Sequence, residues 1–334
     1  MIKLGIIGYG YWGPNLVRNF NGNKNFRVIK VADTRHERLE LIKKQYPGII
    51  SVPDSEDIFN DHEIDAVAIA TPVFAHHKLA KKALLSGKHV LLEKPMTSSS
   101  QEAEELINIS LSKNLSLMVD HTFLYTGAVQ KIKQLIDQET IGKIKYLDST
   151  RINLGLFQPD INVLWDLAPH DISILTHLVN EKPYSLNASG VSHTNNDLEN
   201  IAFLTVNFES GFIAHFNCSW TSPVKIRLML IGGDKKMIVF NDVEPTEKIK
   251  IYDTGYSVKT DEDKQKLLVD YRTGDIFIPK TPSTEALALM AEDFAQSILK
   301  NKVPVADYKS GLSVIKILEA SNESLRNHGK EIIF

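Results

Sequence analysis

The amino-acid sequence predicts an α/β protein in two parts: a doubly wound parallel sheet, then an α+β domain built on a mainly antiparallel sheet. Three observations lead to this prediction. The chain has 334 residues, more than a typical single domain. Short apolar runs alternate with helical apolar spacing up to about residue 120, and tight turns separate consecutive strands beyond it. We therefore expect two domains, over residues 1–120 and 121–334.

The first part contains five short runs of apolar residues. The segments between them have the 3.6-residue apolar period of an amphipathic helix. Repeated strand-helix-strand units have parallel strands, which are buried between helices on both faces. The predicted strands are Lys3–Ile7, Arg27–Ala32, Ala66–Ala70, Val90–Leu92 and Ser116–Val119.

The second part begins with helical spacing and continues as paired strands. The turns at residues 209–211 and 232–234 are too short to connect parallel strands, so the strands that they join are antiparallel. Helices are predicted at Gly127–Gln138, Val163–Val179 and Ser283–Leu299, hairpins at Ile201–Ser219 and Lys225–Phe240, and irregular chain at Thr254–Phe277.

Composition excludes several classes of protein. The net charge is -3 and no sustained basic run is present, which argues against a nucleic-acid partner. The single cysteine, Cys218, indicates a reducing compartment. The N-terminal apolar run is too short for a signal peptide, and no window has the ~20 apolar residues of a membrane helix. We expect a cytoplasmic protein without a membrane partner.

A glycine turn follows the first predicted strand. Gly8, Gly10 and Gly13 have the GxGxxG spacing and lead into a helical pattern at Asn15–Phe20. Glycines at these positions allow a tight turn, close approach of a pyrophosphate and close helix–strand packing. A plain strand-to-helix corner is the alternative explanation.

Asp33 favours the dinucleotide site over the plain corner. It ends the next strand, 20 residues after Gly13, where a carboxylate binds the ribose hydroxyls of a Rossmann-bound cofactor. Its charge would repel the 2′-phosphate of NADP, so NAD is the predicted cofactor and NADP the second choice. Arg35 could partly compensate for that charge or stack on the adenine.

Two further breaks end buried strands, at Ala70-Thr71-Pro72 and Glu93-Lys94-Pro95. The carboxyl ends of parallel strands line the ligand crevice of such a sheet, so both breaks should face the cofactor. The predicted cofactor-binding residues are Gly8, Tyr9, Gly10, Tyr11, Trp12, Gly13, Asp33, Thr34, Arg35, Ala70, Thr71, Pro72, His76, Glu93 and Lys94.

The whole chain resembles the Gfo/Idh/MocA oxidoreductases, named for glucose-fructose oxidoreductase and inositol dehydrogenase. The matching stretches are GYGYWG, the ATP of residues 70–72 with His76, the EKP of residues 93–95, and WDLAPHD at residues 165–171. The resemblance implies an N-terminal Rossmann domain, a C-terminal domain with an open-faced sheet that builds homodimers or homotetramers, and a cis bond before Pro95. It also implies that Lys94, Asp166 and His170 are the catalytic residues.

These three side chains suit hydride exchange with an alcohol. Imidazole is a base of suitable pKa, so His170 would accept the hydroxyl proton. Lys94 would stabilise charge on the reacting oxygen, and Asp166 would orient the histidine or bind a hydroxyl. Because Pro169 lacks an N–H, we expect the helix to begin near it, with Asp166 on the entering turn.

A metal site is the competing use of Asp166, His170 and His177, but no cysteine cluster or HExxH pattern supports it. We expect no metal.

The predicted substrate is a nucleotide sugar. HTFLYTGAV, SPVKIR and YRTGDIFIPKTPSTEAL resemble the branch of the family that oxidises UDP-N-acetylglucosamine-type substrates at C3. Lys225 and Arg227 share a face of a predicted strand and could bind a diphosphate, with an ordinary polar face as the alternative. The candidate substrate contacts are Lys94, His121, Tyr125, Arg151, Asn153, Asp166, His170, Lys225 and Arg227.

Two other functions stay open. A dehydrogenase of a free polyol or aldose, such as an inositol, would need fewer cationic groups. A non-catalytic NAD-dependent sensor would not need the proton-transfer groups Lys94, Asp166 and His170.

Overall fold

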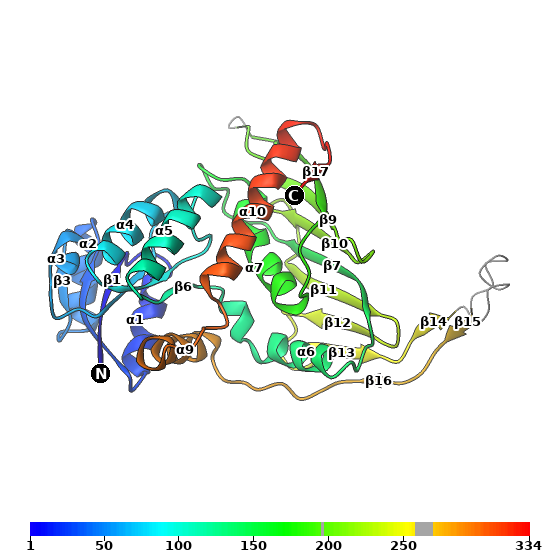
Figure 1. Cartoon of the computed structure of the whole chain (residues 1–334), viewed down its shortest axis with the longest axis horizontal. Coiled ribbons are helices and arrows are strands. Elements are labelled where there is room, and N and C mark those ends of the chain that lie inside the picture. The colour runs from blue at the N-terminus through cyan, green and yellow to red at the C-terminus, as the bar shows by residue number, and fades with distance from the viewer. Residues whose placement is uncertain (195–196, 258–269) are drawn as a thin grey trace. The chain divides into compact units, whose positions relative to one another are not determined.

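A computed structural model describes residues 1–194, 197–257 and 270–334, which form two compact units (Figure 1). The first unit comprises Met1–Thr126 and Thr284–Lys316, and the second comprises Gly127–Ser283 and Ile317–Phe334. The expected range 1–120 differs from the first unit because a late segment of the chain also belongs to that unit.

The first unit contains a six-stranded parallel sheet in the order β3-β2-β1-β4-β5-β6. The strand order reverses between β1 and β4, which confirms the doubly wound arrangement. Its elements are β1 Ile2–Ile7, α1 Gly13–Gly22, β2 Phe26–Ala32, α2 His36–Gln45, β3 Ile50–Val52, α3 Glu56–Phe59, β4 Ala66–Ile69, α4 Val73–Leu85, β5 His89–Leu92, α5 Ser100–Ser112, β6 Leu117–Val119, η1 Thr122–Tyr125 and α9 Ala286–Lys300, and α10 Tyr308–Arg326 is divided between the units.

Helix α9 lies beside α1 although more than 260 residues separate them (Figure 1). The Phe294 ring stacks on Phe26 at 5.9 Å and meets Phe20 edge-on at 6.4 Å. All three aromatic side chains are buried. This cluster assigns the late segment to the first unit.

The second unit contains a nine-stranded sheet in the order β16-β13-β12-β11-β7-β10-β9-β8-β17. All its pairs are antiparallel except β7 with β10, which confirms a mainly antiparallel sheet. Its elements are α6 Gly127–Asp137, β7 Ile144–Ile152, α7 Val163–Leu178, β8 Ser185–Val191, β9 Ile201–Asn207, β10 Ile213–Ser219, β11 Ile226–Gly233, β12 Met237–Asn241, β13 Ile249–Tyr252, β14 Gly255–Ser257, β15 Asp270–Arg272, β16 Ile276–Phe277 and β17 Ile332–Ile333.

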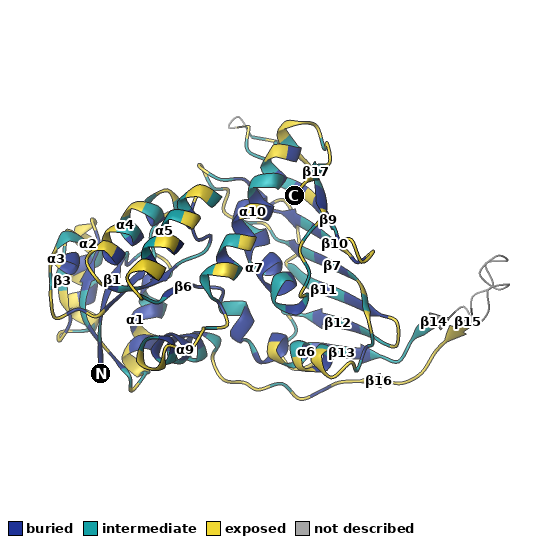
Figure 2. Cartoon of the chain, viewed as in Figure 1, coloured by how far each residue is buried: buried dark blue, intermediate teal, exposed yellow. Residues whose placement is uncertain are grey.

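Burial alternates along the strands of this sheet (Figure 2). One face packs against α7, which contacts β7, β9 and β10. The other face keeps apolar side chains partly exposed, among them Phe203 and Ile213 at 42% each.

The predicted strands and helices agree with the structure to within a few residues. The prediction lacks β3, β7, β8, β13, β17 and α10, and the stretch expected to be irregular holds β14, β15 and β16. Part of that stretch, residues 258–269, lies outside the described residues.

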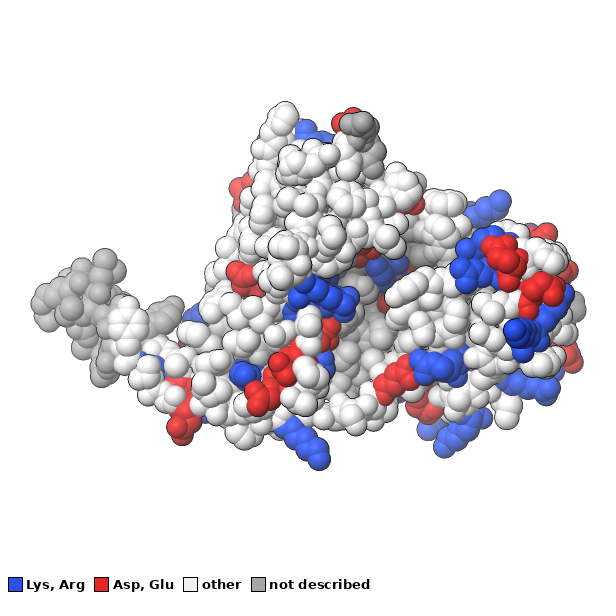
Figure 3. Space-filling model, turned by 180° about the vertical axis from the view of Figure 1, so that it is seen from behind, with Lys and Arg blue, Asp and Glu red and all other residues white. Residues whose placement is uncertain are grey.

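Acidic and basic side chains are intermixed on the face that Figure 3 shows. Within the described residues, no helix is both long and apolar enough to span a membrane.

Candidate active site

The glycine turn has the geometry that a dinucleotide requires. Gly8 has a φ of 95°, and a Cβ there would collide with the Ala70 carbonyl. A Cβ on Gly13 would collide with the Gly8 carbonyl, whereas the nearest atom to a Cβ on Gly10 is Nη2 of Arg35 at 3.5 Å. Gly8 and Gly13 are therefore required by packing, and Gly10 leaves its backbone open to a ligand.

Helix α1 begins at this turn with Trp12 as its N-cap, and no side chain caps it. An uncapped helix N-terminus attracts an anion through its N–H groups and its dipole. The turn therefore fits a pyrophosphate. Tyr11 is 93% exposed beside it, whereas the Tyr9 ring is buried and donates to Gln45.

Asp33 is buried where β2 ends, and it accepts hydrogen bonds from the turn and from Arg35. The Tyr9 N–H donates to Oδ2 at 2.7 Å, and the Arg35 guanidinium donates to both carboxylate oxygens at 2.9–3.0 Å. Burial alone would raise the pKa of Asp33, but hydrogen bonds from Arg35 and Tyr9 lower it below its ordinary value. The carboxylate is thus ionised and already paired with Arg35, while Thr34 beside it is exposed.

His76 links the two strand-end breaks. Its Nδ1 lies 2.9 Å from the Pro95 carbonyl and its Nε2 lies 2.8 Å from the Thr71 carbonyl. The ring is 1% exposed, so these two carbonyls hold it in place, and its contact with the cofactor stays a prediction. Pro72 is the N-cap residue of α4, and the Lys94–Pro95 peptide bond is cis, as predicted.

Glu93 and Asp120 form a pair of enclosed carboxyl groups at the ends of β5 and β6. Burial, then the charge of Asp120 and a hydrogen bond between the two groups, raise the pKa of Glu93 well above its ordinary value. Asp120 also accepts hydrogen bonds from the Trp12 indole at 2.9 Å and from the Thr122 hydroxyl. Burial beside Asp120 therefore favours the protonated form of Glu93.

His121, next to Asp120, is 1% exposed, and within the described chain neither ring nitrogen has a hydrogen-bond partner. Burial, and then the charge of Lys94, lowers its pKa to about 3. His121 is therefore a neutral imidazole close enough to Lys94 to sense its charge.

The Tyr125 hydroxyl is committed within the first unit. It donates to Asp293 at 2.9 Å and accepts from the Ala306 N–H at 3.2 Å. The side chain is 2% exposed. These bonds tie η1 to α9, and the expected substrate contact of Tyr125 stays a prediction.

Helix α7 presents Asp166 and His170 on one face, because residues four apart lie one above the other. Both are half-buried. Two starts were expected: the one at Val163 from the apolar spacing is confirmed, and the one near Pro169 is wrong, because Pro169 lies inside α7. Asn162 caps the helix by accepting from the Trp165 N–H at 3.2 Å, which fixes the earlier start.

Trp220, directly after β10, is a site residue that the sequence analysis missed. Its indole Nε1 donates to Oδ2 of Asp166 at 2.9 Å. The two residues are 54 positions apart, and only the β10–α7 packing reveals the contact.

Arg151 has an internal partner. Its guanidinium makes a two-point ion pair with Asp171 of α7, at 2.6 and 2.8 Å, and both side chains are 5% exposed. The neighbouring strand carries Arg227 opposite Arg151, and Arg227 pairs with Asp242 at 3.2 Å. Both arginines are thus engaged within the second unit.

Lys225 is exposed and precedes β11, so it does not share a strand face with Arg227 as expected. Asn153 is half-buried just after β7, and its N–H donates to the Ser219 carbonyl at 3.1 Å.

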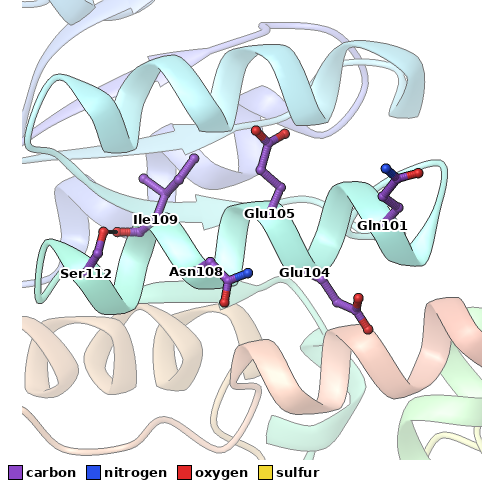
Figure 4. Close-up of a pocket in the computed structure, with 6 residues that line it drawn as sticks. All are labelled: Gln101, Glu104, Glu105, Asn108, Ile109 and Ser112. Atoms are coloured by element: carbon purple, nitrogen blue, oxygen red, sulfur yellow. Dashed lines mark hydrogen bonds between the residues drawn. The ribbon is translucent and has the colours of Figure 1, made fainter.

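A hollow of about 480 Å³ lies on α5 and contains none of the predicted site residues (Figure 4). Glu105 is paired there with Lys81 and His77, and Glu104 with Lys316. Among the described residues, no three His, Cys, Asp or Glu side chains are grouped to hold a metal ion.

Comparison with known proteins identifies both halves of the chain. Residues 2–121 match the oxidoreductase family with an NAD-binding Rossmann fold, and residues 129–239 match the GFO/IDH/MocA C-terminal domain. The uncharacterized oxidoreductase YdgJ of Escherichia coli is 30% identical over 189 residues, 51% of each chain, so this match spans about half of that relative.

Two other relatives carry more specific names. The scyllo-inositol 2-dehydrogenase (NADP(+)) IolW of Bacillus subtilis is 24% identical over 97% of this chain and 93% of its own. The UDP-N-acetylglucosamine 3-dehydrogenase of Acidithiobacillus ferrooxidans is 28% identical over 65% of this chain and 67% of its own.

The solved structure of that Acidithiobacillus enzyme, GnnA, has the same fold, with a TM-score of 0.80 and 24% identity over 98% of both chains. The two matched domains, in this order along the chain, agree with the glycine turn and the mainly antiparallel sheet described above. The chain therefore belongs to the Gfo/Idh/MocA family of oxidoreductases.

Proposed function

We propose that this protein is an NAD-dependent dehydrogenase of a sugar secondary alcohol, and that its substrate is a nucleotide sugar of the UDP-N-acetylglucosamine type, oxidised at C3. The observation that carries the proposal is the pair of Asp166 and His170 on one face of α7, in a chain whose glycine turn fits a pyrophosphate. A binding module has no need of that pair.

Three side chains have separate roles in proton transfer and in the stabilisation of charge. NAD, when bound, supplies the hydride acceptor. His170 accepts the hydroxyl proton as the alcohol is oxidised, because imidazole is the side chain best suited to act as a general base near neutral pH. Asp166 orients that imidazole, and the Lys94 ammonium stabilises negative charge on the reacting oxygen.

A free polyol is the second candidate substrate, and a specific observation favours it. Arg151 and Arg227, expected to contact the substrate, are engaged by Asp171 and Asp242. A diphosphate would have to draw on other cations, such as the exposed Lys225.

Thermal shift separates the two candidates. With NAD present, UDP-N-acetylglucosamine should raise the melting temperature and myo- or scyllo-inositol should not, because only a ligand of the folded state stabilises it. If only an inositol raises the melting temperature, the substrate is a free polyol and the proposal of a nucleotide sugar is wrong.

Turnover tests the chemistry itself. The absorbance of reduced nicotinamide should rise when the stabilising sugar is added to the wild type. Lys94→Met should abolish that rise while NAD still binds, and the exposed Lys113→Ala is the matched control. Unchanged turnover in Lys94→Met would refute the proposed mechanism.

A further inference from the structure

We propose that Trp220 is a positioning residue for this reaction: its indole N–H fixes the orientation of the Asp166 carboxylate beside His170 on α7. The inference rests on the proposed function, in which Asp166 orients the histidine that takes the proton.

The contact is well placed for this role. The indole nitrogen lies 2.9 Å from Oδ2 of Asp166, and the Trp220 side chain is 1% exposed. An indole N–H can only donate, so it suits a carboxylate that must remain an acceptor. A bond to an ionised group is also stronger and more directional than one between neutral groups. Trp220 therefore restricts Asp166, and water cannot easily replace it.

The chain after β7 encloses the indole. The Gly155 N–H donates to the Trp220 carbonyl at 3.0 Å, and the Phe157 ring packs against the indole at 5.5 Å. A Cβ on Gly155 would lie 3.0 Å from the indole Cδ1, closer than ordinary packing allows. The indole therefore has little room to turn its N–H away from Asp166.

Trp165 provides the contrast within the same helix. It is next to Asp166 in sequence and 5% exposed, yet its indole nitrogen has no hydrogen-bond partner in the described chain. Of the two buried tryptophans, Trp220 donates its indole N–H to a carboxylate, and Trp165 makes no such bond within the described chain.

The test is a double-mutant cycle in steady-state turnover, with single-turnover hydride transfer as the measurement for variants that are too slow. Trp220→Phe keeps most of the ring and removes the N–H. We expect kcat to fall about ten- to one-hundredfold, with KM changed less than about threefold and NAD affinity unchanged. In an Asp166→Ala background the same substitution should change kcat by less than about twofold.

Trp165→Phe is the matched control and should retain kcat within about twofold. An equal loss in the Asp166→Ala background would mean that Trp220 acts through packing, and would overturn the inference. A wild-type kcat in Trp220→Phe, or an equal loss in Trp165→Phe, would also overturn it. Failure of the proposed function would appear earlier, as absent turnover in the wild type, and the inference would fall with it.

Discussion

Burial and the neighbouring Asp120 favour the protonated form of Glu93 in the folded protein. Its pKa is raised by burial and by Asp120, so its contribution to stability is complete below the unfolded pKa of about 4.3 and is lost as pH rises toward the folded value. Glu93→Gln cannot lose a proton. We therefore expect its melting temperature to fall less than that of the wild type between about pH 5 and pH 8.

Thermal unfolding at several pH values measures this difference. The exposed Glu323→Gln is the control and should follow the wild type. Parallel curves for Glu93→Gln and the wild type would show that the Glu93 carboxyl is ionised in the folded state.

We predict that Arg35 tunes the choice between NAD and NADP. Its guanidinium neutralises Asp33, whose charge would otherwise repel a 2′-phosphate. Arg35→Gln should weaken NADP binding about tenfold and change NAD binding less than about threefold. Cofactor titrations followed by tryptophan fluorescence measure both constants. If the binding of NAD and of NADP weakens equally, Arg35 contacts a part that both cofactors share, such as the adenine.

It was easier to predict which residue types matter than to predict which of their side chains are available to a ligand. The geometry of the glycine turn could be predicted because it depends on local backbone, and the role of Asp33 in binding the ribose stays a prediction. The internal partners of Arg151 and Tyr125 could not be predicted, since Asp171 and Asp293 lie 20 and 168 residues away. A buried partner found only through packing decides whether a polar side chain is available to a ligand.

At the scale of elements, one ion pair joins β7 to α7. Arg151 and Asp171 are both 5% exposed. Asp171→Ala would remove the carboxylate that pairs with the buried Arg151 guanidinium, at a cost of about 3–5 kcal/mol in the free energy of unfolding. Urea denaturation measures this loss in the free energy of unfolding. Asp137→Ala, which breaks a half-exposed pair with Lys133, should cost about 1 kcal/mol or less.

The double variant Arg151→Met with Asp171→Leu should recover most of that loss, because apolar replacement removes both buried charges. If it is as unstable as Asp171→Ala, the loss is due to packing and not to the unpaired charge.

Helix α7 shows where local rules compete. The apolar spacing predicted a start at Val163, and Pro169 predicted a later one. The structure has the earlier start, because Asn162 caps the helix and also donates to Glu199 and Asn322 at 3.0 Å. The N-cap therefore decided between the two local signals. The strand β3, with three residues, was missed because so short a run has no measurable period.

At the scale of the whole molecule, the fold of the first unit depends on two segments that are far apart in the sequence, residues 1–126 and 284–316. A fragment of residues 1–126 would lack α9 and so expose Phe20 and Phe26. We expect this fragment to aggregate or to lack a cooperative thermal transition. Circular dichroism and calorimetry test this.

A second fragment, with residues 1–126 linked to 284–316, is the matched control and should unfold cooperatively. The linker can be short, because Gly127 and Pro282 are in contact next to the two cut points. A cooperative transition in the 1–126 fragment alone would show that α9 is dispensable.

We propose that the partly exposed face of the nine-stranded sheet forms a homodimer or homotetramer, because exposed apolar surface favours association. Light scattering should show an oligomer for the wild type and a monomer for Phe203→Glu with Ile213→Glu. Val303→Glu is the control, since Val303 is 71% exposed in the loop after α9. If the double variant keeps the molar mass of the wild-type oligomer, this face is not the interface.

The packing of α9 on α1 also sets an order on biosynthesis. A ribosome makes the six parallel strands first, yet the residues that cover Phe20 and Phe26 emerge only after the entire nine-stranded sheet except its last strand. Domains usually mature in the order in which they are translated. Here the nascent N-terminal half must wait, incompletely covered, until α9 has been synthesised.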